Sequence, residues 1–243
     1  MKTYICLILA LAVSNSIQIL LPSYQSLIPG TTEFPAPIWV IALINAGIAI
    51  VLYGALGLIG LMLSKRLGFA EIWDKGVSNR QRFLTPGILG VVLGIVLIIG
   101  DIIFSRFNGI GRLAHPPFPS SIFASLSAGI GEEIMFRLFF ISFWVWIISC
   151  LTLKGRRKNQ VFWIITIIAA LAFAAGHIPS FMLLYSYKSA SDIPPMLILE
   201  SFLLNGIISI FAAYYMRKNG FLAAACIHFW TDMVWHVLWG VIA

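Results

Sequence analysis

The chain has 243 residues, of which 60% are hydrophobic and 10% are charged. Soluble domains are about 45–50% apolar and about 25% charged, so this composition excludes both a water-soluble globule and a disordered chain. The net charge is +7, but the basic residues form no stripe interleaved with aromatic residues, which argues against nucleic acid as a partner. The remaining class is an all-α polytopic membrane protein embedded in the lipid bilayer.

Seven apolar runs are long enough to cross a bilayer as helices, because about 20 helical residues span its hydrocarbon core. They cover residues 3–21, 38–64, 86–105, 119–153, 160–177, 195–216 and 220–242. The first run resembles a signal peptide at Lys2 and Ala12–Ser14, but apolarity resumes at Ile17–Leu21 and favours a retained helix. We expect one integrated domain, with three spans in 1–118 and four in 119–243.

The basic residues predict an orientation with the N-terminus cytoplasmic and the C-terminus outside the cell membrane. Most Lys and Arg residues then lie inside: Lys2, Lys65, Arg66, Lys75, Arg80, Arg82, Lys154, Arg156, Arg157, Lys158, Arg217 and Lys218. Only Arg106, Arg112 and Lys188 lie outside, and Arg137 lies within a span. Splitting the run 119–153 into two crossings would move the basic residues 154–158 outside, so we expect a single long helix there.

Two connecting segments have distinctive compositions. Residues 65–85 predict a short amphipathic piece on the inner membrane surface, and residues 107–118, rich in Gly and Pro, predict an irregular loop. The three cysteines, Cys6, Cys150 and Cys226, lie in apolar runs without metal-ligand spacing. A disulfide framework or a cysteine zinc site is therefore not expected.

Ionisable side chains inside membrane spans are costly, so each one requires a reason. The spans contain Asp101, Glu132, Glu133, Arg137, His177, Glu200, His228, Asp232 and His236. Asp101 and Glu200 lie near span ends, and we expect them to reach the interface or to pair with a loop base such as Arg106.

Two adjacent carboxylates lie deep in the fourth span. Glu133 and Arg137 are four residues apart, so they can form an ion pair within the helix. Glu132 points about 100° away around the helix and is not paired by this arginine. A structural role accounts for Glu133 and Arg137 but not for the additional acid, which suits a general base or acid.

Histidines mark the ends or faces of two further spans. Phe173 lies one turn before His177 and can pack over its imidazole, although a helix-end histidine can equally be an interfacial cap. His228, Asp232 and His236 recur every four residues along one stripe of the seventh span. These residues can share a metal ion or a proton in a reactive site, or they can form a polar seam that holds two helices together. Together the three spans can place these groups in one cavity within the helical bundle.

The ordered set Glu-Glu-x-x-x-Arg, Phe-x-x-x-His and His-x-x-x-Asp on separate spans resembles the CPBP family of intramembrane proteases, also called the Abi family. This family includes type II CAAX prenyl endopeptidases and proteins linked to bacteriocin immunity. The resemblance covers about residues 119–240, and the first three spans match only as membrane helices. It implies hydrolysis of peptide bonds in a membrane-anchored or lipidated protein or peptide.

The resemblance also implies a role for each catalytic residue. Glu132 would activate the water, while Glu133, held by Arg137, would support the site. His177 would position water or substrate, and His228 with residue 232 would stabilise the oxyanion. Eukaryotic and archaeal relatives carry Asn at the position of Asp232. An ionised Asp cannot donate a hydrogen bond, so Asp232 must be protonated, orient His228, or ligate a metal.

Three alternatives remain open beside a cofactor-free protease. Zinc could be held by Glu132, His177, His228 and Asp232, although the chain has no His-Glu-x-x-His motif. A non-catalytic immunity or scaffold protein would use the same groups as a packing network. A proton-coupled transporter would use them as a relay, but no repeat between the two halves is visible. His236 lies outside the family pattern and could extend the seam or hold Asp232.

Overall fold

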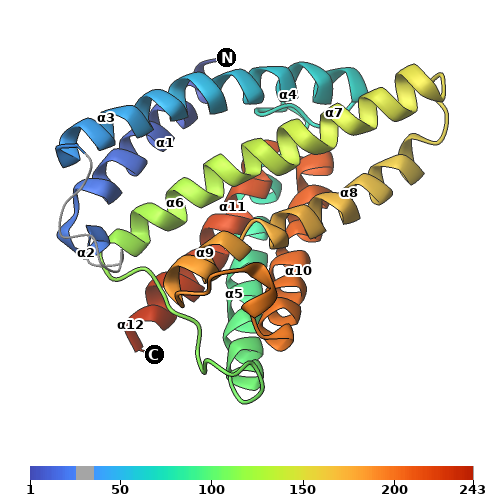
Figure 1. The fold of residues 1–243 in the computed structure, drawn as a ribbon. Helices are drawn as coiled ribbons and strands as arrows, with labels where there is room; N and C mark the ends of the chain where they lie inside the picture. The colour runs from blue at the N-terminus through green and yellow to red at the C-terminus, as the bar shows by residue number, and fades with distance from the viewer. Residues whose placement is uncertain (26–35, 243) are drawn as a thin grey trace.

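The structure is a computed structural model that describes residues 1–25 and 36–242. This part of the chain is all-helical without strands (Figure 1), which confirms the expected fold class. Seven helical segments are long and apolar enough to cross a membrane, as predicted. They are Lys2–Leu20, Ile38–Leu67, Arg80–Phe104, Ser120–Thr152, Lys158–Leu184, Pro195–Asn219 and Phe221–Ile242. The orientation of the termini stays a prediction.

Several of these segments alternate between α-helical and π-helical turns. The N-terminal elements are α1 (Lys2–Leu20), α2 (Pro22–Gln25), α3 (Ile38–Ile48), η1 (Ala49–Tyr53), α4 (Gly54–Leu67), η2 (Arg80–Leu84) and α5 (Thr85–Phe104). The remaining elements are α6 (Ser120–Glu132), η3 (Glu133–Ile141), α7 (Ser142–Val145), η4 (Trp146–Thr152), α8 (Lys158–Ala175), α9 (Ile178–Leu184), η5 (Ala190–Asp192), α10 (Pro195–Asn219), α11 (Phe221–Asp232), η6 (Met233–Trp239) and α12 (Gly240–Ile242).

The fourth span forms one continuous helical segment from α6 to η4, as the basic-residue count predicted. It runs diagonally through the molecule in Figure 1. Its α6 part contacts α1 and α11, and its η3, α7 and η4 parts contact α4 and α8. Because each part contacts one N-terminal and one C-terminal helix, this segment connects the N-terminal spans to the C-terminal ones.

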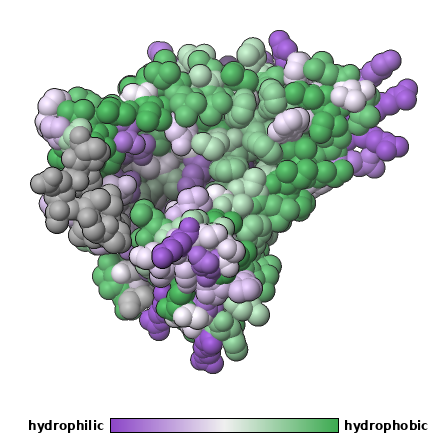
Figure 2. Space-filling view, in the orientation of Figure 1, coloured by the Kyte–Doolittle hydropathy of each residue, from purple (hydrophilic) through white to green (hydrophobic). Residues whose placement is uncertain are grey.

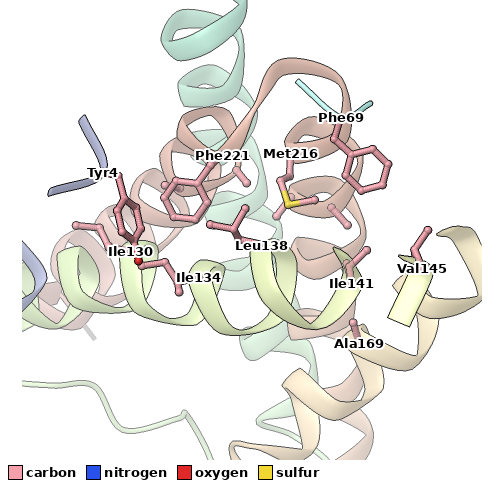
Figure 3. Packing of buried hydrophobic residues seen from close by; sticks show 14 of the residues in the cluster. Tyr4, Phe69, Ile130, Ile134, Leu138, Ile141, Val145, Ala169, Met216 and Phe221 are labelled. Atoms are coloured by element: carbon pink, nitrogen blue, oxygen red, sulfur yellow. The ribbon is translucent and has the colours of Figure 1, made fainter. Parts of the chain in front are cut away.

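The main hydrophobic core follows one face of this long segment. Ile130, Ile134, Leu138 and Ile141 recur every three or four residues and are all buried, which is the spacing of one helical face. Figure 3 shows this stripe meeting side chains from α1, α10 and α11. On the other side of α11, Gly90 of α5 lets the two helices approach closely, since a Cβ there would lie 2.5 Å from a backbone oxygen of α11.

The segment 65–85 differs from the amphipathic surface piece that we expected. Helix α4 continues to Leu67 and ends at Gly68, whose φ of 72° suits glycine. The chain then turns inward and buries Phe69. Arg82 is also buried, and its guanidinium donates hydrogen bonds to backbone carbonyls of the preceding turns. Local packing contacts therefore override the amphipathic pattern, whereas residues 107–118 are irregular as predicted.

Candidate active site

A buried ion pair lies at the centre of the candidate site. Arg137 Nη1 is 3.2 Å from Glu133 Oε1, and both side chains are completely buried. The same carboxylate oxygen accepts a hydrogen bond of 2.8 Å from Nδ1 of His228, which comes from α11. The predicted pairing within the helix is therefore present, and it is extended to a second span.

The aromatic ring of Phe173, on α8, packs against the arginine of this ion pair. The guanidinium carbon of Arg137 lies 4.2 Å from the centre of the Phe173 ring, a cation–π arrangement. The ring also makes edge contacts with His177 at 5.2 Å and with His228 at 5.7 Å between centroids. Phe173 thus contacts side chains from all three motifs, which explains why an apolar residue belongs to a polar constellation.

The second nitrogen of His228 faces the other two carboxylates. Nε2 lies 3.6 Å from Glu132 Oε2 and 3.5 Å from Asp232 Oδ2. Both distances are longer than a direct hydrogen bond, so neither carboxylate fully occupies this nitrogen. The side chain of Glu132 is 39% exposed, whereas that of Asp232 is 8% exposed. Glu132 is therefore the more accessible carboxylate.

His177 lies between α8 and α9, at the same cavity. Its Nδ1 is 3.0 Å from the carbonyl oxygen of Phe173. A carbonyl only accepts, so Nδ1 carries the hydrogen and Nε2 of the neutral ring is left as an acceptor. Glu132, His177, His228 and Asp232 all line one cavity of about 270 Å³. The structure thus brings the predicted groups together, with Glu133 and Arg137 behind them.

Asp101 and Glu200 pair with the loop, as one of the two expected alternatives had it, but their partners are not basic side chains such as Arg106. Both side chains are fully buried. Asp101 accepts a hydrogen bond of 2.9 Å from the backbone N–H of Leu113, and Glu200 accepts one of 2.8 Å from the Asn108 amide. These acids fix the loop 105–119 over the cavity, because a buried carboxylate needs a donor and the loop supplies it.

His236 contacts the same loop and makes no described contact with Asp232. Its Nδ1 lies 3.2 Å from Nδ1 of His115, and the His115 ring packs edge-on against Trp235. Burial lowers the pKa of His115 to about 4. The loop histidine is therefore neutral at neutral pH, and one member of the pair donates to the other.

The sequence analysis missed three loop contacts. Asn108 and His115 lie in the irregular loop, and Tyr185 follows α9, where its hydroxyl accepts from the backbone N–H of Ala114 at 3.0 Å. None of these residues belongs to a periodic pattern. The only indication of these contacts in the sequence was that the loop follows closely after Asp101, an acid within a membrane span that needs a partner.

Glu132, His177, His228 and Asp232 are the residues that would hold a zinc ion. Zinc requires ligands at about 2.0–2.3 Å in tetrahedral geometry. Within the described residues, no three His, Cys, Asp or Glu side chains are grouped so that they could hold a metal ion.

We predict that Asn108→Ala releases the loop. The substitution leaves the Glu200 carboxylate buried without its donor, at a cost of about 1–3 kcal/mol. Limited proteolysis of the detergent-solubilised protein should then cut residues 105–119 faster than in the wild type. Arg106→Ala, at an exposed position of the same loop, is the control, and equal cutting of both variants would contradict the assignment.

We predict that Phe173→Leu lowers the thermal stability of the protein. It removes the aromatic face from Arg137 and the edges from both histidines, which together contribute about 1–3 kcal/mol. Thermal unfolding in detergent measures the shift in Tm. Phe221→Leu is the matched control, because Phe221 is as buried as Phe173 and packs in the apolar core. A shift no larger than that of the control would show that Phe173 is ordinary core.

One comparison with known proteins identifies the chain. Residues 114–234 match a family model described as type II CAAX prenyl endopeptidase, Rce1-like. No curated protein and no solved structure matches. The matched region contains all six predicted catalytic residues and the loop residue His115, whereas α1 to α5 precede it. The chain therefore belongs to the Rce1-like family of membrane proteases, the type II CAAX prenyl endopeptidases.

Proposed function

We propose that this protein is an intramembrane endopeptidase in which Glu132 activates a water molecule against a peptide bond of a membrane-associated protein or peptide. One observation carries this assignment. Of the two adjacent glutamates, Glu133 is fully buried against Arg137 and His228, whereas Glu132 is accessible from the cavity. A general base must be accessible to its water, and of these two glutamates only Glu132 has an exposed side chain.

In this mechanism, the Glu132 carboxylate takes a proton from water as the water oxygen attacks the substrate carbonyl carbon. The carbonyl π electrons move to oxygen and form an oxyanion. Glu132 then returns the proton to the amide nitrogen, the C–N bond breaks, and an acid and an amine are released. The neutral His177 orients the water through Nε2, because its Nδ1 is used by the backbone carbonyl.

His228 stabilises the oxyanion in this proposal. Its Nδ1 is tied to Glu133, so its ring orientation is set before substrate binds. A proton on Nε2 is not held in a short hydrogen bond by either nearby carboxylate and is available to the oxyanion. Asp232 acts as the orienting acceptor for this ring and compensates its charge, rather than donating as Asn does.

The proposed chemistry uses no metal. The lack of a fitting group of ligands among the described residues supports this choice, as does an accessible glutamate that can itself activate water. The histidines are assigned as donors and acceptors of hydrogen bonds.

We predict that Glu132→Gln lowers cleavage by about 10²–10⁴-fold, since it removes the base but keeps shape and polarity. The protein reconstituted in liposomes is incubated with a library of membrane-tethered peptides, with and without S-prenyl groups, and products are identified by mass spectrometry. Glu71→Gln, at an exposed residue paired with Lys65, should cleave like the wild type. Equal cleavage by wild type and Glu132→Gln would remove Glu132 from its role.

We also predict that cleavage survives prolonged dialysis against a strong chelator. A metal-dependent site would lose activity and regain it when zinc is added. Elemental analysis of the purified protein provides an independent measurement. A stoichiometric metal that is absent from His177→Ala would contradict the metal-free mechanism.

A further inference from the structure

A second cavity lies on the other side of Glu132. It has a volume of about 390 Å³ and is formed between α1, η1 and α6. It shares Pro116, Ala128, Glu132 and Ser180 with the first cavity. Figure 2 shows the molecule hollowed near its centre, with hydrophilic surface inside the recess. Glu132 therefore borders both cavities.

The wall formed by α1 carries two side-chain amides. Leu11, Asn15 and Gln18 line the cavity, and their spacing of four and three residues places them on one face of the helix. Neighbouring hydroxyls on α1 have structural partners, because Ser14 donates to the carbonyl of Phe123 and Ser16 to that of Ala42. The amides of Asn15 and Gln18 make no hydrogen bond with any described residue.

The facing wall on α6 is also polar and is kept open by small residues. The Ser127 hydroxyl is buried and has no hydrogen-bond partner among the described residues. Ala124, Ala128 and Gly131 leave space beside it. The buried Ser127 hydroxyl is costly without a partner. The half-buried amides of Asn15 and Gln18 line the same cavity, so one polar ligand can satisfy all three groups.

The first cavity has a different character. Apart from the catalytic groups, much of its wall consists of apolar side chains such as Leu97, Phe181 and Leu204. A peptide segment bound within the membrane must satisfy its backbone N–H and C=O groups. Amides provide both a donor and an acceptor, as a neighbouring strand would. The α1 cavity can meet this requirement next to the base.

We propose that the α1 cavity is a subsite that binds the main chain of an extended peptide substrate on one side of the scissile bond, with Asn15 and Gln18 as the residues that hydrogen-bond to it. This inference rests on the proposed endopeptidase function. It defines the substrate class as an unfolded segment with free backbone amides beside the cleaved bond. The apolar cavity receives the part of the substrate on the other side.

The test uses the double variant Asn15→Leu/Gln18→Met, which keeps the side-chain volumes and removes the hydrogen bonds. The change makes α1 more apolar, so membrane insertion is retained, and an unchanged Tm confirms folding. Binding of the tethered peptide library is measured in the Glu132→Gln background, and kcat/KM is measured with Glu132 intact. We expect both affinity and kcat/KM to fall by about tenfold.

Backbone N-methylation of the peptides separates substrate contact from a structural role. In the wild type, methylation on one side of the cleaved bond should lower kcat/KM by about tenfold, and in the double variant the same methylation should have no further effect. Ser16→Ala, on the same helix turn but outside the cavity, should behave like the wild type.

The outcomes separate the subsite from the proposed function. Unchanged binding and an unchanged methylation effect in the double variant overturn the subsite, while cleavage by the wild type upholds the endopeptidase. Cleavage by neither wild type nor Glu132→Gln, with peptides still bound through Asn15 and Gln18, overturns the endopeptidase and keeps the peptide site. Absence of both binding and cleavage overturns both.

Discussion

The guanidinium of Arg137 carries a positive charge that is completely buried in the protein. The other residues of the site are positioned by the contacts that stabilise this charge. Glu133 supplies the opposite charge, and Phe173 covers the flat face of the guanidinium. Lipid provides no hydrophobic drive for helices to associate, so polar contacts and close packing have a larger part in setting their positions. The bond from Glu133 to His228 joins η3 to α11, and the Phe173 ring brings in α8. One compensated charge thereby aligns three spans.

This arrangement gives two adjacent glutamates opposite roles. They are neighbours in sequence, but the helix turns them about 100° apart, so one faces the ion pair and the other faces the cavity. The chain changes from α to π turns between them, as it does directly after Asp232. π turns inside helices are frequent at functional sites, because they redirect side chains relative to a regular helix. The fixed carboxylate stabilises the histidine, and the accessible one is left for chemistry.

The spans and the central site could be predicted from the sequence because both depend on local rules. Apolar length defines a span, and a spacing of four residues placed Glu133 beside Arg137 and Phe173 beside His177. The kind of partner that Asp101 and Glu200 find in the loop was not predicted, because it is a backbone N–H and an amide rather than a basic side chain. No periodic signal relates a buried acid to a loop that folds back over it. The contact between His115 and His236 likewise joins positions 121 residues apart and depends on tertiary packing.

The N-terminal spans contribute one wall of the second cavity, next to Glu132. All groups assigned to bond cleavage lie within residues 114–234, the segment that matches the family. The amides that face the second cavity lie on α1, outside that segment. Glu132 lines both cavities. In the proposed function its carboxylate is positioned by one half of the chain, and substrate approaches it along a wall from the other half. Changes on α1 can therefore alter how tightly an extended peptide binds without disturbing the Arg137 ion pair.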